Sequence, residues 1–230
     1  MEQIKPPQFE LLDNAVVIAI TGGIGSGKSE AARIFRELGR SVISTDELAK
    51  VVMNTDNSVK KQIISTFGSN SYNSDGVLSA GHISSTVFSG NESQSDNLQK
   101  LNLIVHPPVI ELMISEIEKT IEAGEKLVFV ESALIYESAL DEGFDYIICI
   151  TADDDLRIQR VRQRSGISEE QIIQRMKEQI SQEEKIKLSD FEIENNKSIN
   201  DLKNSINFLL PILESLPPKK SYSSDFDSGK

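Results

Sequence analysis

The chain has 230 residues, of which 38% are hydrophobic and 26% charged, and this ordinary globular composition excludes a wholly disordered chain. A formal net charge of −12 argues against general binding to nucleic acids or anionic membranes, so a phosphate site would need locally concentrated positive charge. Cys149 is the single cysteine, which excludes an intrachain disulfide. No apolar run reaches the roughly 18 residues of a membrane span, and no signal-peptide pattern is present, so we expect a cytoplasmic protein.

The first half of the chain predicts a strand–helix–strand unit followed by a polar insertion. Residues 1–14 have no periodic pattern and indicate a flexible arm. The continuous apolar run at 15–20 is typical of a strand buried on both faces of a parallel sheet. A helix at 30–38, a short strand at 42–43 and a further helix complete the unit. Clusters of Asn, Ser and Gly around short apolar pieces indicate a mainly helical insertion at about 54–105.

The second half continues the alternation of helices and strands, which predicts an α/β fold with a parallel sheet. Ser168 and Gln171 fit a capping box at the start of a helix whose apolar face reaches Ile180. We expect one domain over 15–211 and a disordered tail at 212–230. The other elements expected are helices at 110–121, 153–164 and 199–210, with strands at 126–130, 146–150 and 191–193.

A phosphate-binding motif follows the first predicted strand. Residues 22–29, named the phosphate loop below, read Gly-Gly-Ile-Gly-Ser-Gly-Lys-Ser and fit G-x-x-x-x-G-K-[ST]. Glycines let the backbone turn so that successive N–H groups face phosphate oxygens, and the next helix presents its N-terminus to the same anion. In this motif Lys28 reaches the β- and γ-phosphates and the Ser29 hydroxyl ligates Mg²⁺. We therefore expect a nucleoside-triphosphate site here.

Three classes of nucleotide enzyme compete for this motif: a small-molecule kinase, a GTPase, and a mechanical or transport ATPase. GTPases usually carry Asn-Lys-x-Asp, but the nearest segment, 196–199, lacks the Asp. The Leu-Ser-Gly-Gly signature of transport ATPases is absent from the sequence. Mechanical ATPases place adjacent acidic residues at a strand end, whereas Ser132 follows Glu131 here. The kinase class remains.

Asp46 lies just past the second predicted strand. In an open parallel sheet ligands lie beyond the carboxyl ends of the strands, so Asp46 and Lys28 would be delivered to one crevice. A carboxylate there can accept the proton of an attacking hydroxyl. The alternative is that Asp46 only stabilises the start of the next helix, and spacing alone leaves both roles open.

Three arginines at helical spacing form a second candidate feature. Arg157, Arg160 and Arg164 share one helical face, with Arg162 to one side. On a mobile helix these guanidiniums would close over a triphosphate and neutralise its charge. The alternative is a solvated basic face in which Asp153 pairs with Arg157. The context of a phosphate-loop kinase favours the first reading.

Together these residues closely resemble the dephospho-CoA kinase family. The resemblance covers about residues 15–205 and depends on the order of several motifs, because the phosphate loop alone indicates only a nucleotide-binding protein. The similar segments are 20–29, Asp46-Glu47-Leu48-Ala49-Lys50, Phe67-Gly68, 75–78, Val87-Phe88, 103–107, Glu131 to Glu137, Arg160-x-x-x-Arg164, Arg175-x-x-x-Gln179 and 193–196.

The resemblance implies a three-layer P-loop core with a parallel sheet, a helical substrate-binding insertion and a helical lid at about 155–188. It implies Mg²⁺ with ATP as donor and the ribose 3′-hydroxyl of dephospho-CoA as acceptor, in the last step of coenzyme A biosynthesis. Another small-molecule or nucleoside-monophosphate kinase on the same core is the alternative. Nucleic acid and membrane are not expected partners, and the sequence does not fix the oligomeric state.

Site roles carried over from the family complete the prediction. Asp46 is expected to be the base, Asn195 to lie near the adenine, and Glu30 to contact the nucleotide through its backbone N–H. The expected catalytic residues are Asp46, Lys28 and Arg164; the expected nucleotide-binding residues are Gly23, Gly25, Ser26, Gly27, Lys28, Ser29, Glu30, Arg160 and Asn195; Ser29 is the expected metal ligand.

Four positions depart from the family pattern. Glu30 stands in place of Thr, and Ala133 in place of Pro. Lys50 replaces Arg, which keeps the charge but loses planar bidentate recognition. Ala80 occupies a position where Arg is expected, which puts one acceptor contact in question.

Overall fold

The computed structural model describes residues 15–87 and 94–219, so the predicted arm at 1–14, Phe88 and the tail from residue 220 lie outside the described residues. The chain forms two compact units, one of residues 1–43 and 117–230 and the other of residues 44–116. Among the helices in the described ranges, none has the length and apolar character needed to cross a membrane.

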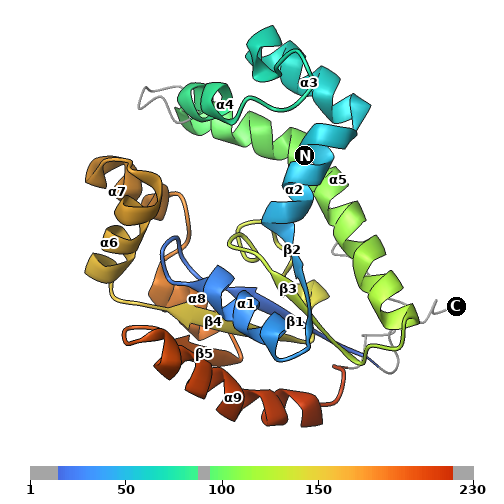
Figure 1. The fold of residues 1–230 in the computed structure, drawn as a ribbon, viewed down its shortest axis with the longest axis vertical. Coiled ribbons are helices and arrows are strands. Elements are labelled where there is room, and N and C mark those ends of the chain that lie inside the picture. Colours follow the sequence, from blue (N-terminus) through green and yellow to red (C-terminus); the bar gives the residue numbers. More distant parts are fainter. Residues whose placement is uncertain (1–14, 88–93, 220–230) are drawn as a thin grey trace, which may run out of the picture. The chain divides into compact units, whose positions relative to one another are not determined.

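The first unit is built on a five-stranded sheet of order β2-β3-β1-β4-β5 (Figure 1). β1 pairs in parallel with β3 and β4, and β4 pairs in parallel with β5. Every residue of the central strand β1 is buried, which explains why its sequence is apolar up to Ile20 and does not alternate. The predicted α/β fold with a parallel sheet is therefore confirmed. The strands are β1 (Val16–Thr21), β2 (Ser41–Ser44), β3 (Leu127–Glu131), β4 (Tyr146–Thr151) and β5 (Phe191–Glu194).

Two helices from opposite ends of the chain share the core on one face of this sheet. Ile34 and Phe35 of α1 are buried with Ile206 and Leu210 of α9, and the ring of Phe35 stacks on Phe129 of β3 with centroids 4.4 Å apart. The helices of this unit are α1 (Lys28–Glu37), α6 (Asp154–Ser165), α7 (Glu169–Lys177), α8 (Gln182–Leu188) and α9 (Ile199–Ser215), with a 3₁₀ turn η2 (Asp141–Gly143).

The second unit is helical and has its own apolar core. Val52, Ile63, Ile83 and Val105 represent this core, one from each of its four helices. The polar segment at about 54–105, expected to be mainly helical, lies in this unit. Its elements are α2 (Thr45–Thr55), α3 (Asn57–Phe67), η1 (Ser69–Ser71), α4 (Ala80–Val87) and α5 (Gln94–Glu122), of which α5 also contributes its last residues to the first unit.

Helix α5 begins earlier than the sequence predicts. We expected a helix at 110–121 that begins after two prolines, but Pro107 and Pro108 lie inside α5. A proline inside a helix costs about 3 kcal/mol because it lacks an N–H and its ring meets the preceding turn. Val105 and Val109 are both buried on the core side of this helix. Two prolines bring the penalty to about 6 kcal/mol, and the burial of the two valines, at about 1.5–3 kcal/mol for each side chain, offsets much of it.

Two carboxylates at the amino ends of strands hold the sheet together at that edge. Asp145 Oδ2 accepts a hydrogen bond from Val17 N at 2.8 Å, and Asp190 Oδ2 accepts one from Ile147 N at 2.8 Å. Burial raises the pKa of the Asp145 carboxyl, and its backbone hydrogen bonds act in the opposite direction.

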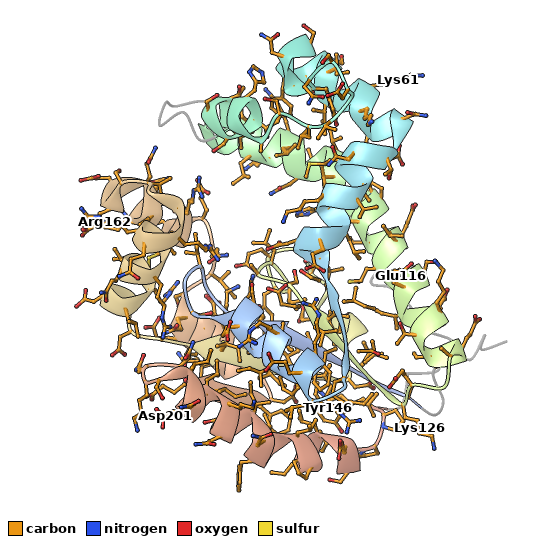
Figure 2. The ribbon with its side chains drawn as sticks, viewed as in Figure 1. Lys61, Glu116, Lys126, Tyr146, Arg162 and Asp201 are labelled. Carbon is orange, nitrogen blue, oxygen red and sulfur yellow. The ribbon has the colours of Figure 1, made fainter. Side chains whose placement is uncertain are left out.

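The same carboxylates bind the segment after α9. The helix continues to Ser215, past the expected domain boundary at 211, and the chain then reaches Lys219. Lys219 N donates to Asp145 Oδ1 at 2.6 Å, and its ammonium lies 3.2 Å from Asp190 Oδ1. Tyr146, labelled in Figure 2, donates through its hydroxyl to Pro217 O at 2.9 Å. Residues 212–219 therefore belong to the ordered part of the first unit.

The environment of Cys149 gives a test of this sheet. The thiol is fully buried in β4, and burial raises its pKa to about 11. Because the thiolate is the reactive form, iodoacetamide at pH 7.5 should leave the folded protein unlabelled and add one group in urea. Mass spectrometry of both samples gives the readout. Rapid labelling of the folded protein would contradict a buried β4.

Candidate active site

The phosphate loop leaves the carboxyl end of β1 and wraps closely against other parts of the first unit. Gly25 and Gly27 have φ values of +81° and +98°, a left-handed conformation that glycine adopts readily. A Cβ on Gly25 would lie 2.5 Å from Arg157 O, and one on Gly27 would collide with Asn195 Nδ2. These two positions therefore require glycine for both conformation and space.

The first turn of α1 brings three polar groups together. Lys28 Nζ lies 2.6 Å from Glu131 Oε1, and Ser29 Oγ donates to the same oxygen at 3.0 Å. Glu131 is the last residue of β3 and lies beside Ile20 of β1 in the sheet. The lysine and glutamate side chains are only 12% and 3% exposed, so this ion pair is shielded from water.

The N-terminus of α1 adds to the positive potential of this site. Gly27 is its N-cap residue and, as a glycine, has no side chain that could accept from the first N–H groups of the helix. Helix N-termini carry N–H groups without intrahelical partners and a partial positive charge, so they attract anions. An ammonium, a hydroxyl, a carboxylate and a helix N-terminus therefore meet at one point. Such a set of groups suits a phosphate, and its oxygen donors also suit a hard divalent cation.

Arg157 of α6 holds the backbone of the phosphate loop. Its side chain is 6% exposed in the described structure, Nε donates to Ile24 O at 3.0 Å, and Nη1 donates to Asp154 Oδ1 at 2.8 Å. The alternative of a solvated face paired with Asp153 is therefore wrong for Arg157, because the loop carbonyl and Asp154 take its guanidinium. The Asp153 side chain instead accepts from Asn196 Nδ2 at 2.8 Å.

Arg160 and Asn195, both expected at the nucleotide, contact the same loop. Arg160 Nη2 donates to Asn195 O at 2.8 Å, and Asn195 Nδ2 donates to Ser26 O at 2.8 Å. Burial lowers the pKa of the Arg160 guanidinium. Arg164 is exposed in the last turn of α6, as is Arg162, labelled in Figure 2. The structure thus brings Arg160 and Asn195 to the loop but not Arg164.

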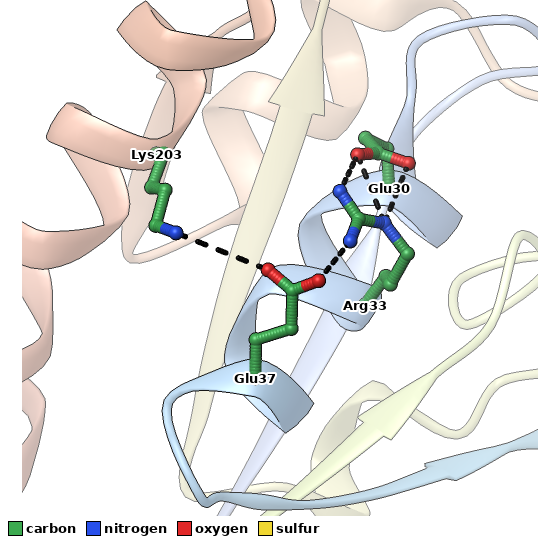
Figure 3. A network of polar contacts seen from close by, with 4 residues as sticks. All are labelled: Glu30, Arg33, Glu37 and Lys203. Atoms are coloured by element: carbon green, nitrogen blue, oxygen red, sulfur yellow. Dashed lines mark hydrogen bonds and ion pairs between the residues drawn. The ribbon is translucent and has the colours of Figure 1, made fainter.

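Glu30 lies on the outer side of α1, within a surface network (Figure 3). Its Oε1 accepts from Arg33 Nε at 3.1 Å, and Arg33 also pairs with Glu37, which lies 4.0 Å from Lys203 of α9. The Glu30 backbone N–H donates to Gly27 O at 3.0 Å. Its expected nucleotide contact therefore stays a prediction.

The remaining predicted residues belong to the second unit. Asp46 is the second residue of α2, directly after β2 in the chain, and is exposed. Ser44 is the N-cap of this helix and makes no side-chain capping hydrogen bond. Lys50 is exposed further along α2, and Ala80 opens α4. The roles assigned to these positions remain predictions.

Gln179 is a contact of the phosphate loop that the sequence analysis did not assign. Its Oε1 accepts from Ile24 N at 2.9 Å. The capping box of Ser168 and Gln171 is confirmed, but α7 ends at Lys177 and does not continue to Ile180. The apolar spacing that suggested a longer helix carries no information about this break. The motif Arg175-x-x-x-Gln179 was the only available signal for Gln179.

Replacement of Asn195 by alanine tests the contact that it makes with the loop. The change removes a buried hydrogen bond, so the free energy of unfolding should fall by about 1–2 kcal/mol. For a chain of this size that corresponds to a decrease in Tm of roughly 2–8 °C, measured by calorimetry. Asn204→Ala, on the surface of α9, is the control and should leave Tm within 1–2 °C, roughly the scatter of surface changes. Equal Tm values for the two variants would contradict a stabilising contact.

Comparisons with known proteins agree with this geometry. The sequence profile of the family described as Dephospho-CoA kinase matches residues 16–201. The Dephospho-CoA kinase of Geobacillus kaustophilus is 35% identical over 79% of this chain and 88% of its own length. That of Bacillus licheniformis is 32% identical over 85% and 95%.

Two solved structures are similar to this chain in fold. A crystal structure from Thermus thermophilus has a TM-score of 0.71 and 30% identity, and covers 87% of this chain and 98% of its own. A dephospho-CoA kinase from Campylobacter jejuni has a TM-score of 0.62 and 26% identity, with coverage of 86% and 97%. The family profile matches most of this chain, and Lys28 and Ser29 of the phosphate loop converge on Glu131. This chain therefore belongs to the dephospho-CoA kinase family.

Proposed function

We propose that the protein transfers the γ-phosphoryl group of ATP to the ribose 3′-hydroxyl of dephospho-CoA, giving CoA and ADP. The observation that carries this proposal is the phosphate loop, whose Lys28 and Ser29 converge on Glu131 in a member of this family. We place the reaction in the cytoplasm, where ATP is available as co-substrate.

The phosphate loop and α6 would bind the triphosphate. Backbone N–H groups at the start of α1 face the anion, and Lys28 exchanges the Glu131 carboxylate for phosphate oxygens. Arg157 holds Ile24 O and so keeps the loop in its turned conformation. Because the loop is fixed before the nucleotide arrives, little conformational entropy is lost on binding.

Ser29 and Glu131 fit a magnesium ion. Mg²⁺ prefers oxygen ligands and is usually held by one or two carboxylates together with substrate phosphates. The Ser29 hydroxyl and the Glu131 carboxylate supply such oxygens 3.0 Å from each other. When bound, the ion neutralises charge on the phosphates during transfer. In the absence of the ion, Glu131 is held by Lys28 and Ser29, which keeps its carboxylate directed to the loop.

Asp46 is our candidate for the base that orients and deprotonates the acceptor hydroxyl. Its support is the family motif at 46–50 and its place in the chain directly after β2. The exposed Arg164, in the last turn of α6, is proposed to contact the phosphates from the lid at 155–188. Glu30 and Asn195 remain proposed nucleotide contacts, and the segment at about 54–105 is proposed to bind the acceptor.

A product assay tests the proposed reaction. Protein with Mg-ATP is incubated with dephospho-CoA, AMP, CMP or shikimate, and without acceptor, and the products are identified by mass. CoA should form from dephospho-CoA alone, and excess EDTA should abolish it, since Mg²⁺ is required by the proposed chemistry. Phosphorylation of another acceptor with dephospho-CoA inert would overturn the proposed substrate. ADP release without acceptor would indicate an ATPase.

The role of Asp46 is tested by Asp46→Asn, with Glu47→Gln as a matched control. Both residues are acidic and lie in the first turn of α2, so both changes alter the charge at this helix terminus equally. Loss of a general base should lower kcat by about 10²- to 10⁴-fold in Asp46→Asn alone. The KM for ATP should change little. Equal, small effects of the two variants would show that Asp46 only stabilises the helix.

A further inference from the structure

A fully buried lysine joins α8 to the loop after β3. Lys185 is 0% exposed, and its ammonium donates to Ala133 O at 2.8 Å and lies 2.8 Å from Glu137 Oε1. The ammonium also lies 5.8 Å from the centroid of the Tyr136 ring. All of these partners come from the loop that follows β3. The ion pair therefore fixes α8 to that loop.

The Glu137 carboxylate, which pairs with Lys185, makes a second contact with the segment just after α7. Glu137 Oε1 accepts a hydrogen bond from Ile180 N at 3.0 Å. Ile180 lies in the short connection between α7, which ends at Lys177, and α8, which begins at Gln182. One carboxylate therefore holds both α8 and the connection before it.

The residue before Ile180 contacts the phosphate loop. Gln179 Oε1 accepts from Ile24 N at 2.9 Å, while Arg157 Nε donates to Ile24 O at 3.0 Å. Ile24 is thus held at both its N–H and its carbonyl by side chains from the segment at 155–188. The orientation of the Ile24 backbone depends on where Gln179 is placed.

Stability alone does not account for a buried ion pair at this position. The attraction between two buried charges offsets their desolvation free energy only where the geometry is good and further hydrogen bonds are made. Well-packed apolar residues in the same place often give an equally stable protein. An apolar pair, however, has no acceptor for the Ile180 N–H. The hydrogen-bonded carboxylate fixes the Gln179–Ile180 connection in a way that apolar packing does not.

We infer that Lys185 and Glu137 are positioning residues of the nucleotide site, which act through Gln179 on the Ile24 backbone. This inference rests on the proposed function only in that the phosphate loop binds a nucleotide. It does not depend on which acceptor is phosphorylated. Neither Lys185 nor Glu137 touches the nucleotide in this proposal.

The test measures binding of Mg-ADP by titration calorimetry to Lys185→Met, Gln179→Ala and the double variant. Each single change should raise Kd by about 3- to 10-fold, the range expected for one hydrogen bond. The Kd of the double variant should equal that of the single variant that binds Mg-ADP more weakly, because both changes disturb the same chain of contacts to the Ile24 backbone. Lys187→Met, at an exposed lysine of the same helix, is the matched control and should keep the Kd of the unchanged protein.

Thermal unfolding distinguishes positioning from a purely structural role. Lys185→Met should lower Tm, whereas Gln179→Ala should lower it much less while weakening binding to a similar extent. If Lys185→Met lowers Tm but leaves Kd within twofold, or if the two effects multiply in the double variant, the inference is overturned. Should Lys185→Met fail to fold, the paired change Lys185→Met with Glu137→Met carries the same test, because an apolar pair leaves no unpaired buried charge and removes the acceptor of the Ile180 N–H. Normal Mg-ADP binding by a protein inert toward dephospho-CoA would count against the proposed substrate alone.

Discussion

The close fit of the phosphate loop against α6 and the end of β5 is the constraint on which the rest of this site depends. A Cβ at Gly23, Gly25 or Gly27 would collide with Arg157 or Asn195. The loop therefore keeps its shape only while α6 and β5 stay in place. Strand pairing of β4 with β1 and β5 supplies that placement, so the sheet determines the geometry of the loop.

Positive side chains are concentrated at the phosphate loop, which explains how an acidic chain can bind phosphate. Lys28, Arg157 and Arg160 gather around one loop in a protein whose formal net charge is −12. Each of them has a protein acceptor: Glu131 for the lysine, and loop or strand-end carbonyls for the arginines. A triphosphate must therefore compete with Glu131 for Lys28. This competition favours ligands of high negative charge over weak anions.

Sequence reasoning predicted the parts of the fold that depend on local pattern. The apolar run at 15–20 predicted the central strand, and the spacing of the phosphate loop predicted the candidate site, because burial and backbone turning are encoded there directly. The helical prolines at 107–108 were misread, since their cost is offset by contacts with residues distant in the chain. The pairing of Lys185 with Glu137 was not predictable either, because nothing in either local segment specifies its partner.

The anchoring of Lys219 fixes the segment after α9 at one edge of the sheet. Its contacts with Asp145 and Asp190 lie at the amino ends of β1 and β4, whereas the phosphate loop leaves the carboxyl end of β1. β1 has six residues, which at about 3.3 Å per residue separates the two edges by ~20 Å. A fluorescent protein or an affinity tag joined after Lys219 would therefore begin a full strand length from the nucleotide. Such a fusion suits surface immobilisation or single-molecule work, because it is attached at the opposite edge of the sheet from the loop.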